Sequence, residues 1–67
     1  MKLREYRKLK GLTITQAAGE IGVSHVAWGY WEKGKRTPEE ANMAAIFRWS
    51  NGAVTPNDFY LLSHTGT

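Results

Sequence analysis

Glycines that favour helix ends alternate with hydroxyl residues that favour helix starts along this chain. Four glycines are each followed, two or three residues later, by serine or threonine: Gly11 by Thr13, Gly22 by Ser24, Gly34 by Thr37, and Gly52 by Thr55. Glycine tolerates the left-handed conformation in which helices commonly end, and a Ser or Thr side chain accepts a hydrogen bond from the first turn of the next helix. The alternation therefore predicts an all-α fold, a compact bundle of about five short helices.

The first two predicted helices are separated by a short turn. The first covers residues 2–10, where Leu3, Tyr6 and Leu9 form one apolar stripe at helical spacing. The second follows Thr13 and ends near residue 21. Three residues after the threonine, a glutamine completes the capping-box pattern.

The third and fourth predicted helices follow the same pattern. The third starts after Ser24 and stops at Gly34. Thr37 is the expected cap of the fourth helix and Pro38 its first helical residue, a position at which proline is favoured. We expect this helix to end at residues 51–52.

The C-terminal part allows two interpretations. Pro56 follows a threonine and predicts one more short helix, reaching residue 62. The β-compatible residues within 53–62 also fit a short β-ribbon. Residues 63–67 are expected to be frayed in either case.

The chain has 67 residues and no cysteine. We expect one domain over residues 1–67, with no sensor or catalytic domain beside it. The absence of cysteine excludes disulfides, thiolate zinc sites and cysteine nucleophiles. No apolar run reaches the ~20 residues that span a bilayer, and no apolar signal segment follows the basic N-terminus. The expectation is a soluble, cytoplasmic protein with no membrane partner.

Enzyme chemistry has few candidate residues in this sequence. His25 and His64 are the only histidines, and no acidic residue is placed to orient either of them in a recognisable catalytic pair. Metal ligands are not clustered either. We therefore expect no enzymatic activity, no metal, no cofactor and no small-molecule ligand.

Positive charge is concentrated in two clusters. Nine Lys and Arg residues against six Asp and Glu give a net charge of +3. Five basic residues lie within residues 1–10, and Lys33, Lys35 and Arg36 follow the third predicted helix. If both clusters lie on one surface, they favour a polyanionic partner; the alternative is an ordinary solvated helix face.

Residues 13–34 have the pattern of a helix-turn-helix motif, two short helices joined by a tight turn containing glycine. Ala18 is small enough for the two helices to cross closely. Ile21 and Val23 flank the turn and can fill the core beneath it. Trp28 is expected to face inward and anchor the third helix.

Five segments of the chain match a known family: Leu12-Thr13, Gln16-Ala17-Ala18, Ile21-Gly22-Val23-Ser24, Trp31-Glu32-Lys33-Gly34-Lys35-Arg36-Thr37-Pro38 and the stretch Asn51-Gly52-Ala53-Val54-Thr55-Pro56-Asn57-Asp58-Phe59. Through these segments the chain resembles the Cro and repressor family of phage regulators, the lambda-repressor-like helix-turn-helix proteins, and within it the short Cro-type proteins. Ile14 stands where members of this family often have a phosphate-binding glutamine.

The resemblance implies a third helix, residues 24–33, that enters the major groove of DNA and reads base edges. The residues at its base-reading positions are Ser24, His25, Val26, Gly29 and Tyr30. Trp31 is expected to pack in the core, and Glu32 to pair with a nearby Lys or Arg.

Phosphate contacts are expected from residues that flank this helix or precede it, because they supply affinity with little sequence information. Arg7 is a further candidate, whereas Lys2 and Arg4 are expected to be solvated. The expected phosphate contacts are Thr13, Gln16, Lys33, Lys35, Arg36 and Lys10.

Members of the resembled family bind inverted repeats as dimers. The C-terminal part carries more apolar residues than one short helix can bury beneath itself, so we expect a weak homodimer that forms mainly on DNA. The alternative is that these residues belong to the core of the monomer. The expected interface comprises Trp49, Val54, Phe59, Tyr60 and Leu61.

The resemblance implies a transcriptional regulator, a Cro-like repressor of phage or prophage origin that covers double-stranded operator DNA in the bacterial cytoplasm. The first alternative is an antitoxin that uses the same motif and also binds a toxin. The second alternative is a helical module that binds only proteins. Salt dependence separates the last case, because DNA binding weakens steeply as salt rises.

Overall fold

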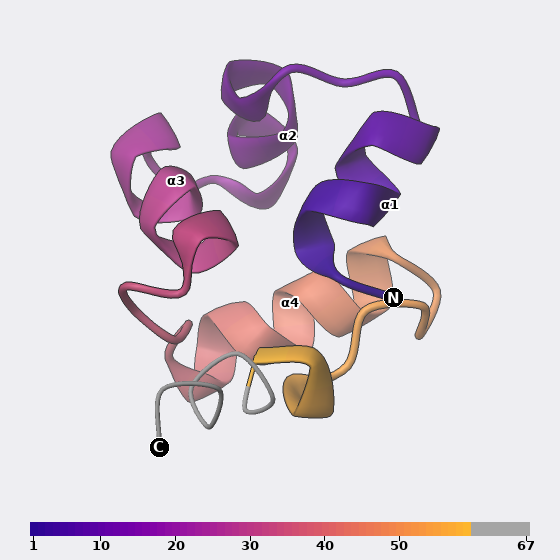
Figure 1. The fold of residues 1–67 in the computed structure, drawn as a ribbon, viewed down its shortest axis with the longest axis vertical. Coiled ribbons are helices and arrows are strands. Elements are labelled where there is room, and N and C mark those ends of the chain that lie inside the picture. Colours follow the sequence, from indigo (N-terminus) through magenta and orange to yellow (C-terminus); the bar gives the residue numbers. More distant parts are fainter. Residues whose placement is uncertain (60–67) are drawn as a thin grey trace.

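The computed structural model describes residues 1–59, which form four α-helices and a final helical segment. The helices are α1 (Leu3–Leu9), α2 (Ile14–Ile21), α3 (His25–Lys33) and α4 (Glu40–Trp49). Residues 56–59 are helical up to the last described residue. α1, α2 and α3 pack together, and α4 crosses beneath them in the view of Figure 1. The predicted all-α bundle is confirmed for this part of the chain, which contains no strand, so the ribbon interpretation is wrong for residues 53–59.

The predicted caps of α2 and α3 are confirmed. The Thr13 hydroxyl accepts a hydrogen bond from the Gln16 amide at 3.1 Å, and the Gln16 side chain accepts one from the Thr13 amide at 2.9 Å. At the start of α3, the Ser24 hydroxyl accepts from the amide of Ala27 at 3.1 Å. Gly22, between the two helices, has a φ of 91°, a conformation in which any other residue is strained.

The structure corrects two details of the prediction. Leu9 does not extend the apolar stripe of α1, because it is 70% exposed and only Leu3 and Tyr6 of the stripe are buried. α4 begins at Glu40 and not at Pro38, its N-cap is the extended Glu39 and not Thr37, and it ends at Trp49 and not at residues 51–52. The proline ring is buried before the helix starts, so it serves packing and not helix initiation.

Aromatic rings occupy the centre of the core. Trp28 is fully buried, and its ring centre lies 6.0 Å from that of Trp31 and 5.4 Å from that of Trp49. Tyr6 packs edge-on against Trp49 at 4.9 Å. These contacts join α1, α3 and α4. The buried apolar set is Leu3, Tyr6, Ala17, Ala18, Trp28, Trp31, Met43, Ile46, Val54 and Phe59.

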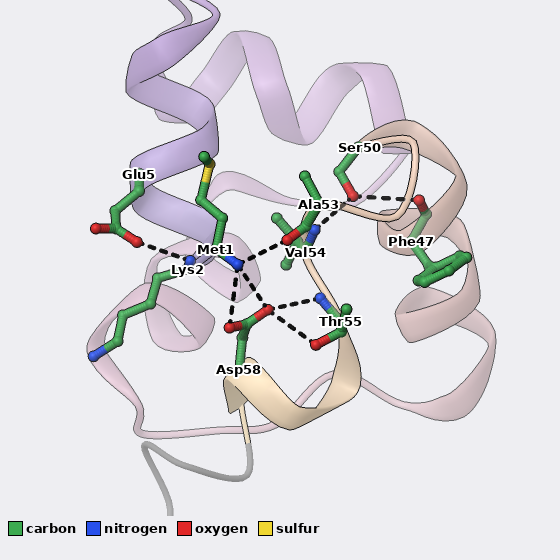
Figure 2. A network of polar contacts seen from close by, with 9 residues as sticks. All are labelled: Met1, Lys2, Glu5, Phe47, Ser50, Ala53, Val54, Thr55 and Asp58. Carbon is green, nitrogen blue, oxygen red and sulfur yellow. Dashed lines mark hydrogen bonds and ion pairs between the residues drawn. The ribbon is translucent and has the colours of Figure 1, made fainter.

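The segment after α4 returns to the start of α1, as Figure 2 shows. The ammonium group of Met1 donates to the carbonyl of Ala53 at 2.8 Å and lies 3.3 Å from the carboxylate of Asp58. Asp58 also accepts from the amide and the hydroxyl of Thr55. Partial burial raises the pKa of Asp58, but the Thr55 hydrogen bonds and the ammonium outweigh it, so this pKa lies below its usual range.

Candidate nucleic-acid interface

α3 has one face in the core and one face in solvent. Trp28 and Trp31 are buried, and at 3.6 residues per turn Val26 and Lys33 lie on the opposite side of the helix. Val26 is 51% exposed, and Lys33 is exposed as well. His25, the first residue of the helix, is also exposed. Figure 1 places α3 at the edge of the bundle, so its outer face is accessible to a large partner.

The inner face of α3 is fixed to α1 by a charged network. The guanidinium of Arg7 makes two hydrogen bonds to the Glu32 carboxylate, at 2.6 and 3.2 Å, and a third to the carbonyl of Leu12 at 2.9 Å. The indole of Trp28 donates to the same carboxylate at 2.6 Å. Only 12% of the Arg7 side chain and 7% of the Glu32 side chain are exposed. The predicted pairing of Glu32 is thereby confirmed, and the charge of Arg7 is already compensated within the chain.

A hollow of about 320 Å³ lies along one edge of the outer face. Three predicted base-contacting residues, Ser24, Val26 and Tyr30, line it together with Arg36 from the loop after α3. The Arg36 guanidinium lies 5.3 Å from the centre of the Tyr30 ring, within cation–π range. The loop is held there because the amides of Lys35 and Arg36 donate to the Tyr30 carbonyl.

A second hollow, of about 330 Å³, lies at the other edge, where α1, α2 and α3 meet. Gly29 and Lys33 line it from α3, and Ile14 lines it from the start of α2. Arg4 of α1 lies at the same hollow and is exposed. A Cβ atom added to Gly29 would have no heavy atom within 4 Å, so the glycine leaves open space beside these two cations.

Arg4 was expected to be solvated, and it is exposed, but the sequence did not indicate that it lies at a hollow beside α3. It precedes Arg7 by three residues, one helical turn, and residues at that spacing lie on the same face of a helix. If the pairing of Arg7 with Glu32 of α3 had been known, this spacing would have predicted that Arg4 also lies beside α3. The sequence alone did not identify the partner of Arg7.

The other predicted phosphate contacts lie apart from these hollows. Thr13 and Gln16 are exposed at the start of α2, where each is part of the capping box. Lys35 is exposed in the loop after α3. Lys10 follows the end of α1, where its ammonium lies 6.0 Å from the Tyr6 ring centre. It lines neither hollow.

The predicted dimer residues are largely used inside the single chain. Val54 and Phe59 belong to the core. Trp49 packs against two aromatic rings, and its indole donates to Glu20 of α2 at 2.8 Å. Tyr60 and Leu61 lie outside the described residues, as do residues 63–67, which were expected to be frayed.

Two further findings concern residues 1–59. No helix in this range is long and apolar enough to cross a membrane. No group of three or more His, Asp or Glu side chains in the same range could hold a metal ion.

The chain was compared with known proteins. A family model described as a helix-turn-helix domain matches residues 1–49, which include α1 to α4 in full. Neither the curated proteins nor the solved structures gave a match.

Proposed function

Because the chain belongs to the helix-turn-helix domain family, we propose that it is a sequence-specific DNA-binding transcriptional regulator. The observation that carries the proposal is the outer face of α3. Val26 is 51% exposed there, between a hollow lined by Arg36 and a second one lined by Arg4 and Lys33. A helix with small or flat side chains outward and cations at its edges fits the major groove, in which bases are flanked by phosphates.

Base readout is assigned to Ser24, His25, Val26, Gly29 and Tyr30. His25 can donate to a base acceptor or accept from an exocyclic amine, depending on its tautomer. Val26 can contact a thymine methyl group. Tyr30 offers a hydroxyl and a ring that Arg36 orients. Gly29 leaves room for the DNA backbone to approach α3.

Phosphate binding is assigned to two groups of residues. Lys33, Lys35 and Arg36 are exposed at and after the end of α3, and Arg4 joins Lys33 at the hollow beside Gly29. Thr13, Gln16 and Lys10 remain candidates near the start of α2. We do not include Arg7, because Glu32 already neutralises it.

One copy of α3 reads only a few base pairs, so we propose that a weak homodimer binds an inverted repeat. Such a protein acts as a Cro-like repressor when its site overlaps a promoter, because the bound dimer excludes polymerase. The resemblance to short phage regulators supports this role.

A binding selection on random duplex DNA tests the proposal. We expect one enriched motif with two-fold symmetry, and binding to it that weakens with a log–log salt slope of about −0.9 per phosphate contacted. A monomeric reader would enrich a single half-site instead. If no sequence is enriched and binding does not respond to salt, the chain is not a DNA-binding regulator and the alternative of a protein-binding module is favoured.

A further inference from the structure

α4 carries a short apolar strip, Ala44 and Phe47, that the other residues within 1–59 leave exposed. Phe47 is 46% exposed although it is large and apolar. Together with Met43 and Ala44 it lines an open groove of about 620 Å³, which Pro38 and Pro56 border. Exposed apolar patches rimmed by polar groups mark sites of protein interaction.

Two opposite charges flank this strip. Glu40 and Arg48 line the same groove, and both are exposed. Neither forms an ion pair with another residue of the described part of the chain. They are eight residues apart, about 12 Å along the helix axis, so they are too far apart for the pairing seen between residues four apart.

We propose that the occupant of this groove is the α4 of a second copy of the chain, packed antiparallel about a two-fold axis at Ala44. An antiparallel pair centred on residue 44 places residue 40 of each copy opposite residue 48 of the other. Glu40 then meets Arg48 of the partner copy twice, once on each side of the axis. A two-fold interface must be self-complementary in this way.

The side chains of the strip suit such a crossing. Ala44 is small and exposed, so two α4 helices can approach closely at the axis. Phe47 lies one turn from the axis, where it covers the partner helix and is itself covered. The apolar part supplies the affinity of the dimer, and the two charge pairs fix its direction and register.

The α4 interface rests on the proposed homodimer and replaces the C-terminal interface that the sequence predicted. Trp49, Val54 and Phe59 serve the core of their own chain, whereas Phe47, Glu40 and Arg48 do not. Self-association through α4 can be measured without DNA, so its outcome is separate from that of DNA binding.

Charge reversal gives the sharpest test. Glu40→Arg and Arg48→Glu each replace two attractive pairs with two repulsive ones, so each variant should self-associate at least about tenfold more weakly than the parent in sedimentation experiments. When the two variants are mixed, both pairs become attractive again, and heterodimers should form with near-parental affinity. Glu39→Arg is the matched control, since Glu39 does not line the groove.

Cysteine cross-linking captures the dimer even when it is weak. The chain has no cysteine, so Ala44→Cys introduces one thiol that lies on the proposed axis. Under mild oxidation this variant should form disulfide-linked dimers at least tenfold faster than Leu9→Cys, which places an exposed thiol on α1.

The proposal is overturned if the two thiols cross-link at equal rates, or if mixing the charge-reversal variants yields no heterodimer. It is also overturned if the parent chain stays monomeric and removing residues 60–67 makes it self-associate, since the groove would then hold the chain's own C-terminal segment. Loss of self-association in Phe47→Glu, with helical content unchanged, supports it.

Discussion

The two faces of α3 differ in how far their side chains are buried and in how many contacts they make within the chain. On the inner face, the side chains of Trp28, Trp31 and Glu32 are all more than nine-tenths buried. The two rings lie in contact with each other, and the Trp28 indole donates to the Glu32 carboxylate. On the outer face, Val26 is 51% exposed, and a side chain at Gly29 would meet open space. The inner face of this short helix is therefore part of the core, whereas the outer face is available to a partner, and substitutions on the two faces should have different consequences.

The two arginines of α1 repeat this comparison. Arg7 makes three hydrogen bonds within the chain and neutralises Glu32. Arg4, one turn earlier, is exposed beside Lys33 and Gly29. A basic residue near α3 is thus not by itself a candidate phosphate contact, because its charge can already be compensated within the fold.

Trp28→Ala on the inner face should have the largest effect. Removing a fully buried large side chain costs about 3–5 kcal/mol, against a total of about 3–10 kcal/mol for 67 residues at roughly 0.05–0.15 kcal/mol each. We expect the variant to be mostly unfolded at 37 °C when unfolding is followed by circular dichroism. A melting curve like that of the parent would show that the inner face does not hold the core together.

Arg7→Ala and Arg4→Ala form a matched pair. Arg7→Ala should lower the free energy of unfolding by about 2–3 kcal/mol, somewhat less than for a fully buried pair because part of Arg7 is exposed. Arg4→Ala should change it by less than about 0.5 kcal/mol but weaken DNA binding. Urea unfolding and a mobility-shift titration measure the two effects, and the reverse pattern would contradict the assignment of both arginines.

Gly29→Ala and Gly19→Ala form a second matched pair, on α3 and α2. Both glycines are helical, and a Cβ atom at either position would lie in open space. Each substitution should therefore stabilise the fold by up to about 1 kcal/mol, and a full 1 kcal/mol would raise the Tm by about 4–8 °C. Only Gly29→Ala should weaken DNA binding, because its methyl group occupies the hollow beside Arg4 and Lys33. Equal DNA affinity of the two variants would remove Gly29 from the interface.

The smallest effect is expected for Lys35→Ala. It should weaken binding to all DNA sequences alike and make the log–log salt slope shallower by about 1. Lys2→Ala is the control, since Lys2 is also exposed but precedes α1, whereas Lys35 lies in the loop that follows α3. A change in sequence preference in Lys35→Ala would mean that Lys35 contacts bases.

Local signals made the boundaries of α2 and α3 predictable from sequence. Thr13, Ser24 and Gly22 act within a few residues of themselves, so their cap and turn geometry can be read directly. The prediction that Pro38 begins a helix was wrong because its ring is buried before α4 starts. This packing overrides the preference of proline for the first turn of a helix.

The roles of the charged and C-terminal residues depended on contacts between distant segments. Arg7 and Arg4 are alike in sequence, and only the position of Glu32, 25 residues beyond Arg7, distinguishes them. Val54 and Phe59 were expected at a dimer interface but are buried because the segment after α4 folds back to the N-terminus. No repeating pattern in the sequence predicts that the segment after α4 packs against the N-terminus.

The central claim is that the outer face of α3 reads DNA sequence. Parallel binding selections on random duplex DNA with the parent chain and with the His25→Ala, Tyr30→Ala double variant test it most directly. Neither side chain belongs to the buried core, so the variant should stay folded and should enrich a motif that is changed or relaxed at particular base pairs. If the double variant is folded, binds DNA and enriches the same motif as the parent, α3 is not the element that reads the sequence.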